Sequence, residues 1–173
     1  LNGGDGVDTL ITTSALASGF TKAKTTGVSN FEILQLNNAL ANDITAANVQ
    51  ATGITTIVIP GGTGTLTMAA GTDNAVAIAA SLTGTLTLVD TGTGTTDAIS
   101  LSNAAIIDDD MGDAKNIVST GYETVNINSS NKNGTETQDF GTITMTADTG
   151  GTTTVNFSGS NKVIVQAITA TAI

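Results

Sequence analysis

Short segments in which threonine alternates with aliphatic residues follow one another from about residue 54 to the end of the chain, separated by Gly, Asn, Asp and Ser turns. Alternation with a period of two is typical of β-strands that bury one face, and β-branched threonine suits the solvated face. Strands are expected at 54–59, 65–68, 75–79, 85–89, 98–102, 123–128, 141–146, 152–157 and 162–166. The chain is therefore expected to be all-β, with at most one or two short helical turns.

One of these segments recurs at a fixed distance. Thr63–Met68 returns as Thr83–Leu88 twenty residues later, and Gly141–Met145 is a third, more distant copy. A repeat of this length is typical of one coil of a parallel β-solenoid, in which each coil stacks on the one before. Aromatic residues make up only 3 % of the chain, and Trp is absent. Such small side chains favour the narrow interior of a parallel β-solenoid or β-roll over a thick globular core.

A longer repeat links Val28–Asn37 to Val118–Asn128, and both copies contain an aromatic residue followed by glutamate. The aromatic residue is expected to plug the end of a coil, and the aliphatic residues after it are expected to enter the core. Two interpretations remain open for Glu32 and Glu123, which are either calcium ligands or exposed acids.

The whole chain, residues 1–173, is expected to form a single elongated solenoid segment cut from a larger protein. Residues 1–27 would be the end of a β-roll, 28–117 a first block of coils and 118–173 a second. Residues 42–49 begin with an asparagine suited to an N-cap, which predicts a helical turn or two on the flank of a coil.

The N-terminal segment Gly3–Ile11 fits the nonapeptide G-G-x-G-x-D-x-U-x, which describes one turn of a calcium-binding parallel β-roll. Its glycines allow a tight turn that aims carbonyl oxygens inward, and Asp8 adds a carboxylate. Calcium is a hard cation that takes six to eight oxygen ligands, so this turn suits it. The candidate metal ligands are Gly3, Gly4, Asp5, Gly6 and Asp8, and an ordinary β-turn is the alternative. Because stacked turns share each ion and only one full copy is present, the site would be incomplete in this segment.

Two further acidic regions are candidate calcium sites. Residues 108–116 form the most acidic stretch and interrupt the strand pattern, so they are interpreted as a projecting loop. Asp108, Asp110 and Asp113 are the candidate ligands there, and a solvated acidic loop is the alternative. Asp90 and Asp97 bracket a Gly/Thr turn, where their carboxylates could also chelate a cation.

Charge and composition exclude several classes of function. The net charge of −10 comes from 15 acidic residues and five scattered lysines, which leaves no basic stripe for nucleic acid. Cysteine and histidine are absent, which excludes Ser-His-Asp and Cys-His catalysis and the usual zinc sites. No apolar run approaches the roughly 18 residues of a membrane span, so no membrane insertion is expected. Calcium is the single expected cofactor, and the chain is not expected to be an enzyme.

The order of the motifs is itself informative. An L-N-G-G-D-G-x-D-x-L turn at 1–10 precedes a G-x-x-x-F-E-x-L-x-L segment at 27–36, then Thr/Gly strands of the G-T-L-T-L kind, then E-T-V-N-I at 123–127. In this order the chain resembles the RTX-type, calcium-dependent surface-layer (S-layer) proteins of Gram-negative bacteria, the Caulobacter surface-layer protein family. The resemblance implies type I secretion to the cell surface and a calcium-filled β-solenoid that tiles with copies of itself in a two-dimensional lattice. It also implies contact with cell-surface polysaccharide through other parts of the parent chain.

Two other functions are compatible with the sequence. The first is a repeat or stalk module of a secreted RTX adhesin, since that role also needs calcium-stiffened β-structure. The second is a carbohydrate-cleaving β-helix that uses Asp108, Asp109, Asp110 and Asp113 as paired carboxylates. Sugar sites usually offer aromatic platforms and Arg or His donors, and this chain has four Phe, one Tyr and neither His nor Arg.

Overall fold

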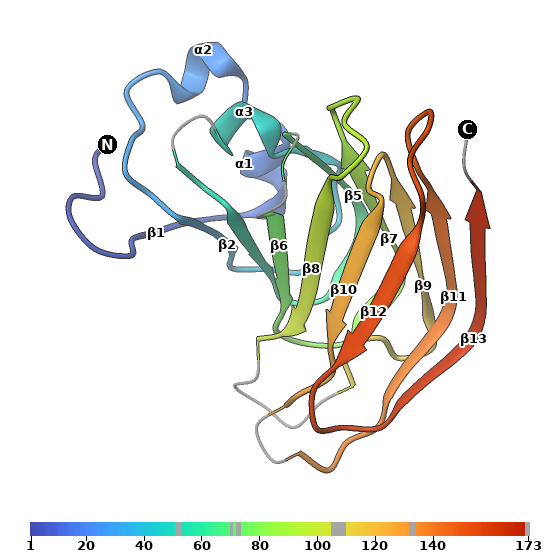
Figure 1. The fold of residues 1–173 in the computed structure, drawn as a ribbon. Helices are drawn as coiled ribbons and strands as arrows, with labels where there is room; N and C mark the ends of the chain where they lie inside the picture. Colours follow the sequence, from blue (N-terminus) through green and yellow to red (C-terminus); the bar gives the residue numbers. More distant parts are fainter. Residues whose placement is uncertain (51–52, 70, 72–73, 105–109, 132–133, 172–173) are drawn as a thin grey trace.

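The chain folds into a parallel β-solenoid, as its sequence predicts (Figure 1). The computed structural model describes residues 1–50, 53–69, 71, 74–104, 110–131 and 134–171. From β2 onward, successive strands alternate between two sheets, so that each coil contributes one strand to each sheet and stacks on the coil before it. All strand pairs between named strands are parallel. In Figure 1 the two termini lie toward opposite ends of the stack.

The first sheet has seven strands: β1 (Thr9–Thr12), β2 (Ile33–Leu36), β4 (Thr56–Ile59), β6 (Asn74–Ile78), β8 (Ala98–Asn103), β10 (Thr124–Asn128) and β12 (Thr154–Ser158). The second has six: β3 (Ile44–Thr45), β5 (Gly62–Met68), β7 (Leu82–Asp90), β9 (Lys115–Thr120), β11 (Gln138–Thr146) and β13 (Val163–Thr171). All nine strands expected from the alternation are present, with bounds that differ by a few residues. Strand β9 was not predicted, because its polar start lay within the acidic stretch interpreted as a loop.

Coil length is not constant, and the expected repeat of 20 residues is wrong as a rule for the stack. Thr56 pairs with Ala75, 19 residues on, whereas Thr124 pairs with Thr154, 30 residues on. Even the repeated segment does not stack on its own copy, because Leu66 pairs with Leu88 rather than with Leu86. A register shift between Gly62 and Gly64 moves the pairing by two residues. The side chains still alternate correctly, since a shift of two keeps each residue on the same face.

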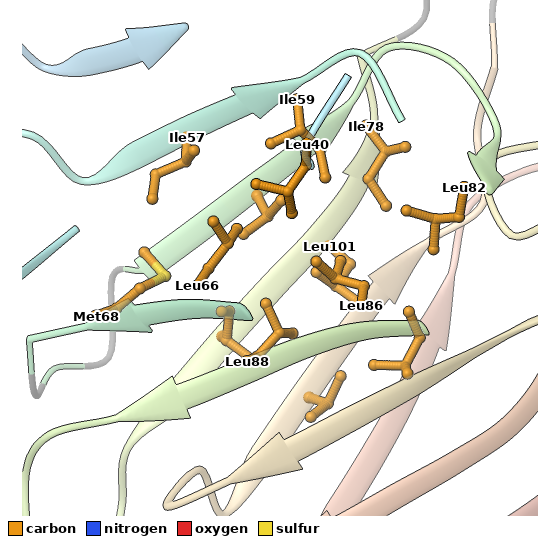
Figure 2. Close-up of a cluster of buried hydrophobic side chains, with 14 of the residues drawn as sticks. Leu40, Ile57, Ile59, Leu66, Met68, Ile78, Leu82, Leu86, Leu88 and Leu101 are labelled. Atoms are coloured by element: carbon orange, nitrogen blue, oxygen red, sulfur yellow. The ribbon is translucent and has the colours of Figure 1, made fainter. Parts of the chain in front are cut away.

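The core is the narrow space between the two sheets, and small aliphatic side chains fill it. Figure 2 shows Leu40, Leu66, Leu88 and Leu101, from different coils, directed into this interior, and all are buried. Most inward-facing residues are Leu, Ile, Val or Met, and Tyr122 and Phe140 are the largest fully buried side chains. Because the space between the sheets is narrow, small aliphatic side chains fill it, which agrees with the low aromatic content of the chain.

Three short helices lie at the N-terminal end of the stack: α1 (Ser14–Ser18), α2 (Lys22–Thr25) and α3 (Ala47–Gln50) (Figure 1). The first two were not predicted, and each begins at a threonine N-cap: Oγ1 of Thr13 accepts from Leu16 N at 3.1 Å, and Oγ1 of Thr21 from Lys24 N at 3.3 Å. The predicted helix at 42–49 is wrong over its first half. Ile44 is instead in β3, where its buried side chain joins the core, and helix begins only at Ala47.

Candidate functional site

The glycine-rich nonapeptide forms the first turn of the stack. Its strand β1 pairs in register with β2, so that Leu10 lies opposite Leu34. The backbone of Gly4 has a φ of 105° and that of Gly6 a φ of 120°, values that favour glycine. Gly3 N donates to Ser29 O at 3.0 Å, which ties the turn to the next coil. The structure thus places the five N-terminal candidate ligands in one turn that stacks like the coils after it.

Within this turn, the two carboxylates have different surroundings. Asp5 is exposed, whereas Asp8 is half-buried at the start of β1. The backbone oxygen of Asp8 accepts from the N–H groups of Glu32 and Ile33, at 3.2 and 3.1 Å. Its carboxylate oxygen Oδ2 is buried and has no hydrogen-bond partner. Of the two carboxylates in this turn, the one on Asp8 therefore has a buried oxygen without a protein partner, whereas Asp5 is exposed.

The two glutamates of the longer repeat join neighbouring coils. Oε2 of Glu32 accepts from Asp8 N at 2.8 Å, and Oε2 of Glu123 accepts from Asp97 N at 2.9 Å. Glu123 also holds the following coil, because its Oε1 accepts from Asp148 N at 3.0 Å. With 3 % exposure Glu123 is not the exposed acid that was one of its two expected roles. The repeated aromatic-Glu pair marked these two positions in the sequence. That the glutamates would hydrogen-bond to the backbone of neighbouring coils was not predicted.

Asp90 and Asp97, which bracket the turn 91–96, meet in the structure. Each is 7 % exposed, Asp90 at the end of β7 and Asp97 just before β8. Oδ1 of Asp90 accepts from Gly92 N at 3.0 Å, but Oδ2 of Asp90 and Oδ2 of Asp97 are buried without a partner. Burial, and to a smaller degree the negative charge of the neighbouring Asp97, raise the pKa of Asp90 to about 6. Two buried carboxyl groups in such contact must share a proton or a cation.

The raised pKa of Asp90 predicts an unusual pH dependence of stability. The folded protein holds this proton more tightly than the unfolded chain, in which the pKa is near 3.8, so ionisation of Asp90 destabilises the fold. Without calcium, we expect the free energy of unfolding to fall by up to about 3 kcal/mol as the pH rises from about 4 to about 6. Urea denaturation in a chelating buffer measures this change. Asp90→Asn should remove most of the fall while Asp5→Asn, on the exposed turn, keeps it; an unchanged fall in Asp90→Asn would contradict the prediction.

The acidic stretch 108–116 lies only partly within the described residues, and Asp108 and Asp109 lie outside them. Asp110 is half-buried, and its Oδ1 accepts from Gly112 N and Asp139 N, both at 2.9 Å. Burial raises its pKa, as does the nearby charge of Asp139 to a smaller degree. Asp113, by contrast, is exposed and forms a 3.2 Å salt bridge with Lys115. Asp110 and Asp113 thus differ both in burial and in their partners, which are backbone N–H groups for Asp110 and a lysine for Asp113.

Sequence reasoning missed two acids that share the features of the predicted ones. Oδ1 of Asp139 and Oδ2 of Asp148 are also buried without a hydrogen-bond partner. The acids Asp90, Asp97, Glu123 and Asp148 lie in successive connections from the six-stranded to the seven-stranded sheet, and we call this set the acidic edge. Over the described ranges, Lys115–Asp113 is the single salt bridge, so none of the lysines described there forms an ion pair with an acid of this edge. Within the same part of the chain, no three acids lie close enough to hold a metal ion among themselves.

Comparison of the chain with protein-family models, curated proteins and solved structures yielded no match. Among the described residues, no helix has the length and apolar character needed to cross a membrane. The fold and the surroundings of the acidic side chains are therefore the features that indicate a function.

Proposed function

We propose that this chain is a structural segment of a bacterial surface layer, which folds in the presence of calcium and assembles with copies of itself into a two-dimensional lattice. The observation that carries the proposal is the position of the nonapeptide. Its turn is stacked in register on the parallel ladder, with β1 as the first strand of the seven-stranded sheet. A calcium-binding β-roll that runs directly into a solenoid is an arrangement suited to a rigid, extended element.

The donor groups of this chain fit calcium. Five buried carboxylate oxygens, on Asp8, Asp90, Asp97, Asp139 and Asp148, lack a hydrogen-bond partner. Oxygen ligands are what calcium requires, and the absence of His and Cys removes the ligands that favour zinc. A buried carboxylate without a partner is costly, and a bound cation offsets that cost.

Calcium then acts as a folding switch. Where free calcium is low, as in the cytosol, repulsion among the carboxylates keeps the coils from closing, which leaves the chain open for type I secretion. Outside the cell, calcium neutralises the acids, and the free energy of binding becomes free energy of folding. This sequence of events needs no catalytic residue.

The last described coil has apolar side chains on strands that are paired on one side. Strands β12 and β13 are each paired on one side, and they expose Phe157, Ile164 and Ile168, whose exposed fractions are 41, 38 and 51 %. Unpaired strand edges with apolar side chains promote contact with further β-structure. Such edges would accept either a further coil of the parent chain or a neighbouring copy in the proposed lattice.

Calcium titration of the chain, followed by circular dichroism and electron microscopy, tests the proposal. We expect β-structure to form with calcium, to be lost on chelation, and to be accompanied by ordered sheets. Calcium-dependent folding without sheets would favour the adhesin stalk. No response to calcium would overturn the proposal and return the nonapeptide to an ordinary turn.

A variant of the N-terminal turn localises the effect. Asp8→Ala should weaken calcium binding and loosen β1, while the strands after Ile54 remain folded because their core does not depend on the turn. Hydrogen exchange of the β1 and β6 amides would compare the two regions. Glu136→Ala, which removes an exposed carboxylate outside the candidate calcium sites, is the matched control. Unchanged calcium affinity in Asp8→Ala would contradict the role of this turn.

A further inference from the structure

A second cation site is indicated in the interior of the stack, far along the chain from the nonapeptide. Asp90 and Asp97 are both more than nine-tenths buried, and each has one carboxylate oxygen with no hydrogen-bond partner. Asp97 lies close enough to Asp90 for its negative charge to act on the Asp90 carboxyl group. Two buried, unpartnered carboxylate oxygens on neighbouring side chains favour a shared proton or a bound cation.

The surrounding backbone encloses this pair. A Cβ atom placed on Gly94 would collide with Oδ2 of Asp97, so the turn 91–96 folds back over that carboxylate. A Cβ atom on Gly121, in the next coil, would lie 3.0 Å from Cβ of Asp90. Glycine at both positions therefore lets the backbone approach the two acids from the turn and from the following coil.

The neighbouring polar groups hold the pair in place without neutralising it. The backbone N–H of Asp97 donates to Glu123, and its backbone oxygen accepts from the N–H groups of Glu123 and Thr124, at 3.0 and 3.1 Å. The fully buried Tyr122 is close enough for the charges of Asp90 and Asp97 to act on its hydroxyl, which accepts from Nδ2 of Asn74 at 3.2 Å. Asn74 and Tyr122 are both neutral, so they supply no counter-charge.

We propose that Asp90 and Asp97 are two protein ligands of a calcium ion bound at the acidic edge, in a site separate from the N-terminal turn. The inference rests on the proposed calcium dependence and assigns part of it to this pair. Two carboxylates neutralise the ion, and backbone carbonyls, hydroxyls or water complete the six to eight oxygens that calcium takes. The site would tie β7 to β8, and through Glu123 to β10, so it would join three successive coils.

The chain supplies its own probe for this site. Tyr122 is the only tyrosine and Trp is absent, so Tyr122 is the one side chain that can strongly sensitise luminescence of a bound terbium ion. Terbium replaces calcium at oxygen sites, and energy transfer from tyrosine falls steeply with distance. Emission excited through tyrosine therefore reports on an ion near Tyr122 and not on one in the N-terminal turn.

Terbium titration of the full chain is the test. We expect saturable emission that calcium displaces, and at least a tenfold loss of terbium affinity in Asp90→Asn and in Asp97→Asn. Asp8→Asn and the exposed Asp113→Asn should leave the emission unchanged, since neither residue is in the pair. Tyr122→Phe should abolish the emission while calorimetry still detects calcium binding at the pair. Circular dichroism shows whether each variant is folded, and Asn at either position retains the size of the side chain.

The outcomes separate this inference from the proposed function. Calcium-dependent folding with no tyrosine-sensitised emission would overturn the site at Asp90 and Asp97 and leave the proposed function in place. Emission that persists at full affinity in both Asn variants would also overturn it, because the ion would then be held by other residues. Emission together with no calcium-dependent folding would keep the site and overturn the proposed role of calcium as a folding switch.

Discussion

Gly62→Ala is expected to destabilise the fold by more than about 4 kcal/mol, enough to unfold many domains of this size. Gly62 has a φ of 110°, and a Cβ atom on it would collide with the backbone nitrogen, carbon and oxygen of Leu40 in the neighbouring coil. Because the obstruction is backbone, no side-chain rotation relieves it. The two coils would have to separate at the point where Leu40 N donates to Gly61 O and Thr63 N donates to Leu40 O.

Gly150→Ala is the matched control for this substitution. Gly150 has a φ of 85°, but no atom lies within 4 Å of the position of its Cβ. The backbone strain is therefore similar and the collision is absent, so we expect a loss of about 1–2 kcal/mol. Urea denaturation of both variants compares the two. Equal losses would show that the strain of the positive φ, and not the close approach of the coils, sets the need for glycine at position 62.

Glu123→Ala is expected to lower the free energy of unfolding by about 3–5 kcal/mol, at about 1.5–3 kcal/mol for each hydrogen bond to a charged group. Glu123 is buried and accepts from the N–H groups of Asp97 and Asp148, which belong to the coils on either side. Removal of its carboxylate leaves both N–H groups without this partner. It also opens space beside Gly151, where a Cβ atom would meet the carboxylate of Glu123.

Glu32 provides the control for Glu123 within the same chain. It occupies the corresponding position of the longer repeat, but it is only half-buried and its side chain accepts from one N–H group, that of Asp8. Glu32→Ala should therefore cost about 1–2 kcal/mol. Glu123→Gln should fall between the two alanine variants, because the amide keeps one acceptor oxygen. A loss in Glu123→Ala no larger than in Glu32→Ala would show that the links from Glu123 to both coils add nothing to stability.

The positions of the strands could be predicted because each strand carries its own signal. In β5 and β7, buried leucines alternate with threonines on the other face, and this pattern does not depend on what lies next to the strand. Short elements without such a signal were missed. Helices α1 and α2 have five and four residues, too few for a periodic pattern, and their threonine caps and packing stabilise them.

The pairing of strands could not be predicted from the repeat. The copies Thr63–Met68 and Thr83–Leu88 suggest that Leu66 stacks on Leu86, yet the shift after Gly62 places it on Leu88. Leu86 and Leu88 are both inward-facing leucines, so the sequence makes the two registers nearly equivalent. The structure adopts one of them through the shift in pairing between Gly62 and Gly64.

The candidate site, too, could be predicted only in part from the sequence. The spacing of Asp90 and Asp97 around a Gly/Thr turn was sufficient to propose that their carboxylates meet. Nothing in the spacing of Asp139 or Asp148 marked either residue, because each gains its buried oxygen only when another coil covers it. Glu123 likewise becomes a buried link only through the N–H groups of two coils that lie 26 and 25 residues away in the sequence.

The sequence by itself determined the all-β class, the narrow aliphatic core and the tight glycine-rich turn at the N-terminus, since these follow from local alternation, composition and a nine-residue motif. The tertiary structure alone decided coil length, register and which carboxylates lose contact with water. Those properties depend on contacts between residues that are 19 to 30 positions apart. The alternation within a strand determines which of its faces is buried. The neighbours of each buried group are determined only when whole coils stack on one another.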